Sequence, residues 1–350
     1  MLCITCLVLF CLGLAVIYSV GLTEEGAKLT DFKKQMIFGV VGFVLFFVIS
    51  LSNYSGLWVY GRIIFASAII LLVAVLFLGA TIRGTQGWFS LGGIGLQPVE
   101  LAKIALIILL AKFFSNRLQR FKSGKHIIVS LFICLCLAVP VLLQPDMGSA
   151  LILFGLWFIL LALTGIKKSY FIILVVVFLI LFLLVGAFLL KDYQRERIKI
   201  FFNPQADPQG SGYNVSQSII GIGSGRFWGR GLGFGSQSQL KFIPEAKTDF
   251  IFAVIAEELG LIGVLFVLGG WGLIFYRLQR IAKQAKNDFG MFLVLGVMVL
   301  FFLHLLVNVG MNIGLMPVMG ISLPLLSYGG SFLIASLILI GIAESVYVRR

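Results

Sequence analysis

The stretch LCITCLVLFCLGLAVIYSVG, residues 2–21, carries no charged side chain over its whole length. A helix needs about 20 apolar residues to cross the hydrocarbon core of a bilayer, so this stretch predicts a transmembrane helix. A secretory signal peptide would carry a basic region and a small-residue cleavage site, and neither is present. We therefore interpret residues 2–21 as the first membrane span.

Similar apolar runs recur along the 350 residues, which are 60% hydrophobic and only 12% charged. A soluble domain keeps about a quarter of its residues charged. The composition therefore excludes a water-soluble enzyme, a disordered chain and a disulfide scaffold. The apolar runs predict ten helices, at 2–21, 35–53, 57–80, 98–114, 127–144, 147–165, 169–190, 250–275, 289–313 and 322–347.

The predicted class is an all-α integral membrane protein, a single polytopic domain over residues 1–350. Residues 191–249, between spans seven and eight, form a long loop rich in Gly, Ser, Gln and Asn. Loops this long without secondary structure are usually functional, so we expect the chemistry there. Part of the loop, residues 193–202, is basic and amphipathic, as is typical of a helix lying along the membrane surface.

The net charge of +13 also has a simple explanation in the loops. With the N-terminus inside, the inner loops hold 13 Lys and Arg, whereas the short outer loops hold four. Positively charged loops stay in the cytoplasm, so we expect both termini there and residues 191–249 outside. This distribution accounts for the basic charge without a nucleic-acid partner. The five cysteines lie in apolar runs and predict no metal site.

Asp249 stands where the long loop enters the eighth span, in GSQSQLKFIPEAKTDFIFAVIAEELG, residues 235–260. A carboxylate at that boundary loses part of its water, which makes it a stronger base. The alternative is a helix N-cap formed by Thr248 or Asp249, and both roles can hold together. Glu245 is the rival carboxylate, in an exposed turn.

A second polar cluster lies in TIRGTQGWFSLGGIGLQPVELAK, residues 81–103. Glu100 and Lys103 share one helix face and can form an ion pair. Alternatively, Lys103 holds an anionic substrate group while Glu100 orients it. Arg83 and Trp88 fall in the outer loop, where Trp88 is either an interfacial anchor or a platform for a sugar ring.

Other polar residues mark the ends and interiors of spans. Asp146, in VLLQPDMGSA at 141–150, is a predicted N-cap of the sixth helix. Glu257 and Glu258 lie about two turns into the eighth span, where charge is costly. We expect one of them to point into the bundle and to be paired, in a structural ion pair or, as the alternative, in a proton relay.

The ninth span and the connection after it form a further candidate. His304, Asn308 and Asn312 repeat every four residues and share a helix face, which suits hydrogen bonds between helices. The uncharged connection around Gly320 could dip into the membrane, which is tolerated where protein covers it. Residues 327–330, Ser-Tyr-Gly-Gly, are expected to interrupt the last span and to allow close packing.

The outer loop also carries a basic cluster, formed by Arg195, Arg197, Lys199, Arg226 and Arg230. A guanidinium binds two phosphate oxygens at once, so these residues suit a phosphate group. The alternative is a general attraction to anionic lipid headgroups.

Together these motifs resemble the SEDS family (shape, elongation, division and sporulation proteins), and within it the branch that acts in cell elongation. The opening GLAVIYSV resembles the family's first span. Two departures are Val99, where the family usually has Ser, and the lack of a short basic lead before the first span. The matching strings, in the family's order, are QPVELAK, QPDMG, FFNPQADPQGSGYNVSQS, IPEAKTDFIFAVIAEELG and GISLPLLSYGGS.

The resemblance implies a ten-span peptidoglycan glycosyltransferase of the bacterial cytoplasmic membrane, which polymerises lipid II on the outer face. It implies as partners a class B penicillin-binding protein and other membrane proteins of the elongation complex. It places the family's essential aspartate at Asp249 and its conserved Glu and Lys at Glu100 and Lys103.

The implied reaction sets chemical requirements for the site. An α-linked donor that becomes a β-1,4 bond inverts in a single displacement, which needs a general base on the acceptor hydroxyl. Positive charge must stabilise the leaving undecaprenyl pyrophosphate. Asp249 is the expected base, and Lys103 and Arg197 are the expected pyrophosphate contacts. No cofactor is evident, although a divalent cation, Mg²⁺ or Mn²⁺, could assist.

Two other classes of function stay open on the sequence alone. One is a flippase or transporter for the lipid-linked precursor, and the other is a non-catalytic scaffold of the elongation machinery. A transporter needs charged groups across the full membrane depth, whereas here they collect toward the outer half. The environment of Asp249 is the only argument in the sequence against a non-catalytic scaffold.

Overall fold

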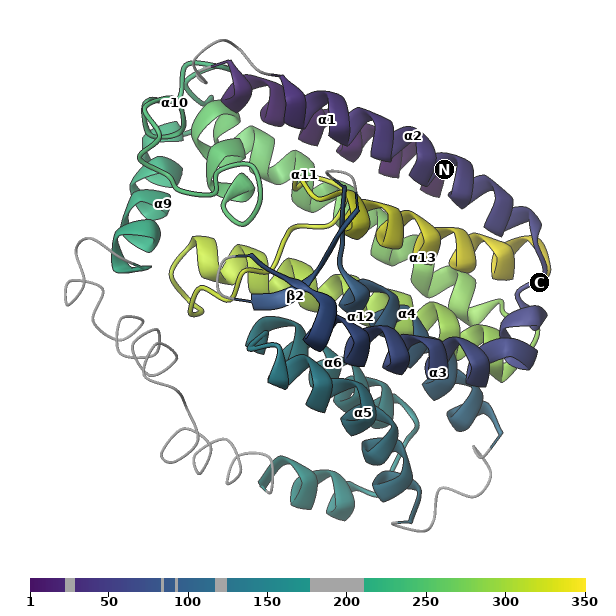
Figure 1. The fold of residues 1–350 in the computed structure, drawn as a ribbon. Coiled ribbons are helices and arrows are strands. Elements are labelled where there is room, and N and C mark those ends of the chain that lie inside the picture. Colours follow the sequence, from purple (N-terminus) through teal and green to yellow (C-terminus); the bar gives the residue numbers. More distant parts are fainter. Residues whose placement is uncertain (23–28, 83–84, 92–93, 117–124, 177–210) are drawn as a thin grey trace.

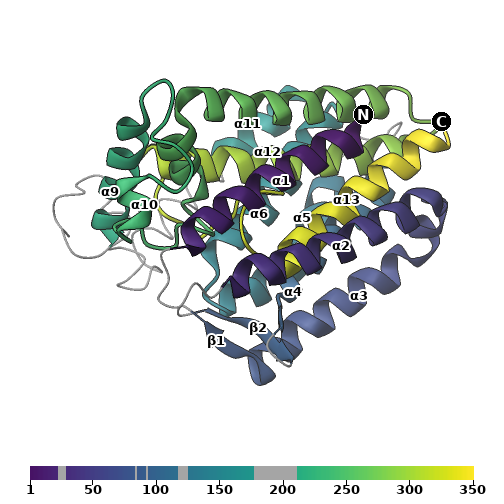
Figure 2. The ribbon, with the colours of Figure 1, turned by 90° about the horizontal axis from the view of Figure 1, so that it is seen from above.

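The computed structural model of the protein describes residues 1–22, 29–82, 85–91, 94–116, 125–176 and 211–350. Both termini lie at one end of a helical bundle, which we call the terminus end (Figures 1 and 2). The opposite end, called the loop end, carries a small sheet and two short helices. The helices are α1 (Leu2–Gly21), α2 (Thr30–Leu51), α3 (Ser55–Leu78), α4 (Pro98–Ser115), α5 (Lys125–Leu143), α6 (Met147–Leu163), α9 (Ser211–Gly225), α10 (Ser236–Gln239), α11 (Ile251–Lys283), α12 (Asp288–Asn312) and α13 (Gly330–Val348).

The predicted all-α membrane class is confirmed. Seven of the described helices (α1, α2, α3, α5, α11, α12 and α13) are long and apolar enough to cross a membrane, and α6 is a shorter apolar helix. The fourth predicted span is α4, which carries Glu100, Lys103 and Lys112. The seventh, 169–190, lies largely outside the described residues, although 168–176 are helical.

A small antiparallel sheet at the loop end was not predicted. Its strands β1 (Ala80–Ile82), β2 (Thr85–Leu91) and β3 (Ile94–Leu96) follow α3 in the order β1-β2-β3. Trp88 pairs with Ala80, and its ring lies so close to Gly95 that a Cβ there would be 3.0 Å away. Trp88 therefore belongs to a folded hairpin and is half-buried.

The centre of the bundle is formed by α4, which contacts α3, α5, α6, α12 and α13. Its side chains at Ala102, Ala105, Leu106 and Leu110 have no exposed surface. Glu100 and Lys103 lie on this helix and are also buried, so their charges lie inside protein rather than in lipid.

The eighth span differs from its prediction because α11 is broken. Gly260 has φ 64° and ψ −161°, a backbone conformation open essentially only to glycine. The loop around Phe227 and Gly229 lies directly against this break: the amide of Leu261 donates to the carbonyl of Arg226 at 2.9 Å. The outer part of α11, Ile251–Leu259, is thus set at its own angle by the preceding loop.

Replacing Gly260 by Ala should lower the melting temperature of the purified protein. The backbone conformation alone costs a non-glycine residue about 1–3 kcal/mol, and the new Cβ would also collide with the amide of Gly229. Gly272→Ala on the same helix is the matched control, since a Cβ there meets no atom within 4 Å. Equal melting temperatures of the two variants would show that the glycine conformation at residue 260 is not required for stability.

Candidate active site

Asp249 is fixed through its main chain by two side chains of α12. The amides of Asn308 and Asn312 each donate to the carbonyl oxygen of Asp249 at 3.0 Å. Asn308 also donates to the carbonyl of Ile321 at 2.7 Å. The predicted hydrogen-bonding face of the ninth span is thus confirmed, and it joins Asp249 to the connection between α12 and α13.

The two residues before Asp249 are held by that same connection. The amide of Tyr328 donates to the carbonyl of Lys247 at 2.8 Å, and the hydroxyl of Ser327 donates to the carbonyl of Thr248 at 2.6 Å. Gln35 of α2 in turn accepts the amide of residue 329 at 3.1 Å and donates to the carbonyl of Ser327 at 3.0 Å. Three successive carbonyls therefore anchor the segment that presents the carboxylate.

This use of Ser327 and Tyr328 corrects the prediction for residues 327–330. They precede α13, which begins at Gly330, rather than interrupt a helix. The reason is that their polar groups bind the segment before α11 and are not available to a helix. The connection is covered by protein only in its second part, where Ile321, Leu323, Leu325 and Leu326 are buried, whereas Gly320 is exposed.

The Asp249 carboxylate faces Gly320 in this connection. A Cβ at Gly320, whose φ is 69°, would stand 3.7 Å from Oδ2 of Asp249. The start of α6 lies against the same stretch, since a Cβ at Gly148 would be 2.5 Å from the carbonyl oxygen of Met319. Asp146 caps α6 as predicted, accepting the amide of Ser149 at 2.9 Å.

The predicted cap of the eighth helix by Thr248 or Asp249 is wrong. α11 begins at Ile251, and a first-turn amide, that of Ala253, donates to Oδ1 of Asn312 at 3.2 Å. The Thr248 hydroxyl instead donates to Glu245, which is exposed. Because α12 supplies this contact, the position of Asp249 is not explained by capping.

Glu100 and Lys103 form the self-paired bridge at 2.8 Å, and both are buried, at 7% and 1% exposure. Nζ of Lys103 also lies 3.3 Å from Nε2 of His304, whose Nδ1 is 3.3 Å from the carbonyl oxygen of Ser322. An ammonium can only donate, so Nε2 accepts and Nδ1 carries the proton. A buried chain of contacts thus leads from α4 to the connection that faces Asp249.

Glu257 and Glu258 are both fully buried and paired, but their partners correct the expected ion pair. Glu257 accepts the backbone amides of Gln237 and Ser238 at 2.7 and 2.9 Å. Glu258 accepts the hydroxyl of Ser19 of α1 at 2.6 Å. The donors are neutral groups rather than a cation because the segment that contains α10 folds onto α11 at these two residues. The contacts hold α10 and α1 against α11.

The family of this protein is shown by a match over the whole length of the chain. The model of the family described as "Cell cycle protein", which unites FtsW, RodA and SpoVE, matches residues 1–350. The chain belongs to the FtsW/RodA/SpoVE family. The resemblance predicted from the motifs is thereby confirmed.

Individual members of the FtsW/RodA/SpoVE family show how close the similarity is. Peptidoglycan glycosyltransferase MrdB of Escherichia coli (strain K12) is 40% identical over 316 residues, 90% of this chain and 84% of MrdB. A chain from a structure described as "Structural coordination of polymerization and crosslinking by a peptidoglycan synthase complex" is 30% identical with a TM-score of 0.81, covering 99% of this chain and 97% of that one. The rod shape determining protein RodA of Thermus thermophilus is 25% identical with a TM-score of 0.74, covering 100% and 96%.

The structure also brings to this region residues that the sequence did not single out. Lys247 forms an ion pair with Asp31 of α2 at 2.9 Å. Burial raises the pKa of the Tyr328 hydroxyl, and the neighbouring Asp31 carboxylate raises it further. Gln35 has a signal in the sequence, since a polar side chain within an apolar run is costly unless it is bonded. Of the predicted site residues, Arg83, Arg195 and Arg197 lie outside the described residues.

Proposed function

We propose that this chain is a peptidoglycan glycosyltransferase that polymerises lipid II into β-1,4 glycan strands during cell elongation. The observation that carries the proposal is Asp249, whose backbone is fixed by α12 at the loop end and whose carboxylate is not required as a helix cap. The names of the relatives support the activity, and the rod-shape name of the T. thermophilus protein supports the elongation branch.

In the proposed reaction, Asp249 accepts the proton of the 4-hydroxyl of the incoming saccharide. The hydroxyl oxygen attacks the anomeric carbon of the growing chain, the bond from that carbon to undecaprenyl pyrophosphate breaks, and the configuration inverts. A general base in fixed register with the hydroxyl contributes about 10²–10⁴-fold in rate. The leaving pyrophosphate takes the bonding electrons and needs no acid once its charge is neutralised.

Positive charge for the leaving group is assigned to Lys103 and Arg197. Lys103 is held by Glu100 and contacts His304 of α12, the helix whose asparagines hold the carbonyl of Asp249. Arg83, Trp88, Arg195, Glu245 and Asp146 complete the proposed substrate-binding set. A divalent cation, Mg²⁺ or Mn²⁺, would assist the departure of the pyrophosphate by neutralising its charge.

For the multi-pass chain we propose a place in the bacterial cytoplasmic membrane, with the loop end outside. Its proposed partner is a class B penicillin-binding protein, which cross-links the glycan. Support comes from the similarity to a chain of a complex described as coordinating polymerization and crosslinking. The shared location of the two termini at one end of the bundle agrees with an even number of spans (Figure 2).

The orientation predicts that a tag at the C-terminus is protected in intact cells. An impermeant reagent should label it only after the membrane is broken, whereas a cysteine placed at Phe234, which is exposed at the loop end, should react at once. Labelling of the tag in intact cells would show the opposite orientation, in which the proposed active site does not lie on the outer face.

Polymerase and flippase are distinguished by the product. Purified protein in liposomes is given fluorescent lipid II confined to the outer leaflet, and the lipids are separated on a gel. The proposal predicts a ladder of glycan chains from the accessible leaflet. Transfer of lipid II across the bilayer with no ladder would favour a flippase. The absence of both the ladder and the transfer would favour a scaffold.

A further inference from the structure

The glycine-rich loop between α9 and α10, residues 225–235, is bonded into the break of α11. Two amides and two carbonyls of α11 bond to this loop. The pairs, as donor amide and acceptor carbonyl, are Leu261 to Arg226 at 2.9 Å, Ile262 to Phe227 at 3.3 Å, Arg230 to Glu257 at 3.0 Å and Gly231 to Glu258 at 2.9 Å. In an unbroken helix, each of these α11 amides would donate to one of these α11 carbonyls. The loop therefore satisfies the backbone of the break and is fixed to α11 at one depth.

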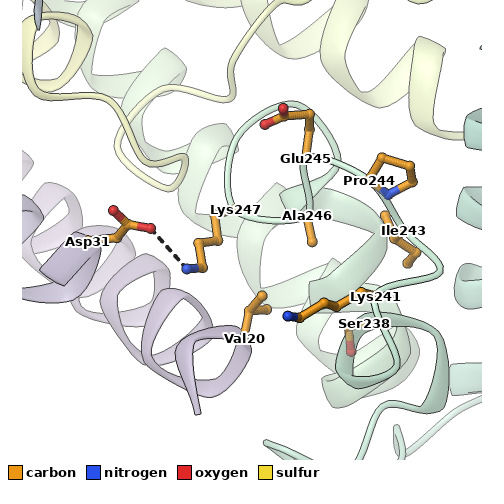
Figure 3. A pocket seen from close by; sticks show the side chains of 9 residues that line it. All are labelled: Val20, Asp31, Ser238, Lys241, Ile243, Pro244, Glu245, Ala246 and Lys247. Atoms are coloured by element: carbon orange, nitrogen blue, oxygen red, sulfur yellow. Dashed lines mark hydrogen bonds and ion pairs between the residues drawn. The ribbon is translucent and has the colours of Figure 1, made fainter. Parts of the chain in front are cut away.

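The position of α1 relates this depth to the membrane. α1 has 20 residues, and a helix of that length spans about 30 Å, the thickness of the hydrocarbon core. Ser19, near its loop end, donates to Glu258 at 2.6 Å. The next residue, Val20, lines a polar pocket whose charged side chains mark the aqueous side (Figure 3). Because α11 runs from the loop end to the terminus end, residues 260–262 lie on the membrane side of this level.

Two aromatic residues of the loop lie at the depth of the break. Phe227 and Trp228 are 66% and 83% exposed, although their backbone is held against α11. Leu261 and Ile262 of α11 are exposed beside them, and Leu265 continues this apolar surface along the helix. Exposed Trp and Phe side chains that adjoin the lipid-facing surface of a span are typical of the membrane interface.

The charges and the glycines of the loop agree with this setting. Arg226 and Arg230, on either side of the aromatic pair, are both exposed, and guanidinium groups at a membrane surface bind headgroup phosphates. A Cβ at Gly225 or Gly229 would lie 1.9 or 2.2 Å from a carbonyl oxygen of α11, so only glycine allows this close approach. The loop cannot leave this depth without breaking its hydrogen bonds to α11.

We propose that Phe227 and Trp228 are inserted into the membrane leaflet at the loop end and anchor the broken part of α11 there. The partner of this surface is the lipid itself, with acyl chains against the two rings and phosphates beside the two arginines. The anchor fixes the height of the outer part of α11, Ile251–Leu259, relative to the leaflet. Asp249 lies directly before this segment, so its height is fixed as well.

Tryptophan fluorescence of the purified chain in nanodiscs tests the insertion. The emission of Trp228 is obtained as the difference between wild type and Trp228→Phe, which keeps an aromatic ring at this position. In phosphatidylcholine that is brominated on its acyl chains, most of this emission should be lost. Iodide in the buffer should leave it nearly unchanged, because iodide does not enter the bilayer.

The matched control is a tryptophan at residue 234, in Trp228→Phe/Phe234→Trp. Phe234 belongs to the same loop and is exposed, but the loop has left the break at this point. A Cβ at the next residue, Gly235, would lie 2.8 Å from the Glu257 carboxylate, on the outer side of the break. Iodide should therefore quench this tryptophan, and the brominated lipid should not.

Two results would overturn the proposal. Quenching of Trp228 by iodide and not by the lipid would place the aromatic pair in water, as a surface for a partner protein. Quenching by neither agent would place the pair inside the protein.

A second pair of variants tests the anchor by stability. Trp228→Glu should lower the melting temperature in nanodiscs, since a charged side chain is costly in the membrane, whereas Phe234→Glu should not. Equal melting temperatures of these two variants would contradict the insertion.

Discussion

Replacing Asp249 by Asn should lower the initial rate of lipid II polymerisation by about 10²–10⁴-fold, the usual contribution of a general base. The amide has the size of the carboxylate but no useful proton affinity at neutral pH. The contacts that position residue 249 use its main-chain carbonyl, so they survive the substitution. Membrane insertion, the melting temperature and binding of the penicillin-binding partner should therefore stay close to those of wild type.

Asp288→Asn is the matched control, because Asp288 lies in the first turn of α12 at the terminus end. This variant should polymerise lipid II at the wild-type rate. A near wild-type rate for Asp249→Asn would show that the base is elsewhere, with Glu245 the next residue to test. Loss of the melting transition together with activity would instead give residue 249 a structural role.

Replacing Lys103 by Met should lower the free energy of unfolding by about 3–5 kcal/mol, because it leaves the Glu100 carboxylate buried without its partner. Glu100 is 7% exposed and lies on the central helix, so water cannot readily replace the ammonium. The measurement is the thermal unfolding of both proteins in the same detergent.

The double variant Lys103→Met/Glu100→Gln separates charge from packing. It removes both charges and should recover most of the lost stability, since replacing a whole buried pair is often nearly neutral. If Lys103→Met alone melts at the wild-type temperature, the pair does not support the fold. If single and double variants are equally destabilised, the loss comes from the contact with His304 and not from an unpaired carboxylate.

The helical framework was predictable because lipid forces each spanning segment to satisfy its own backbone. Run length and charge alone located α1 to α6 and the three last spans. The face formed by His304, Asn308 and Asn312 followed from helical spacing. Its partners did not, because Asp249 lies 59 and 63 residues away from the two asparagines.

Features that depend on contact between distant segments were not predictable from the sequence. The break at Gly260 exists because the loop around Gly229 lies against it, and nothing in the apolar pattern of α11 indicates that contact. The same applies to Glu257 and Glu258, whose partners are backbone amides and a hydroxyl rather than a cation. The cap of α11 was assigned to neighbours in sequence when α12 supplies it.

On the proposed function, this chain itself transfers the saccharide of lipid II with inversion. The most direct measurement incubates the purified protein with labelled lipid II, beside a partner whose transpeptidase serine is inactivated, and analyses both products. We expect glycan chains that a β-1,4-specific muramidase digests completely, with one undecaprenyl pyrophosphate released per disaccharide added. Unchanged lipid II, or a ladder that depends on the partner and persists in Asp249→Asn, would contradict it.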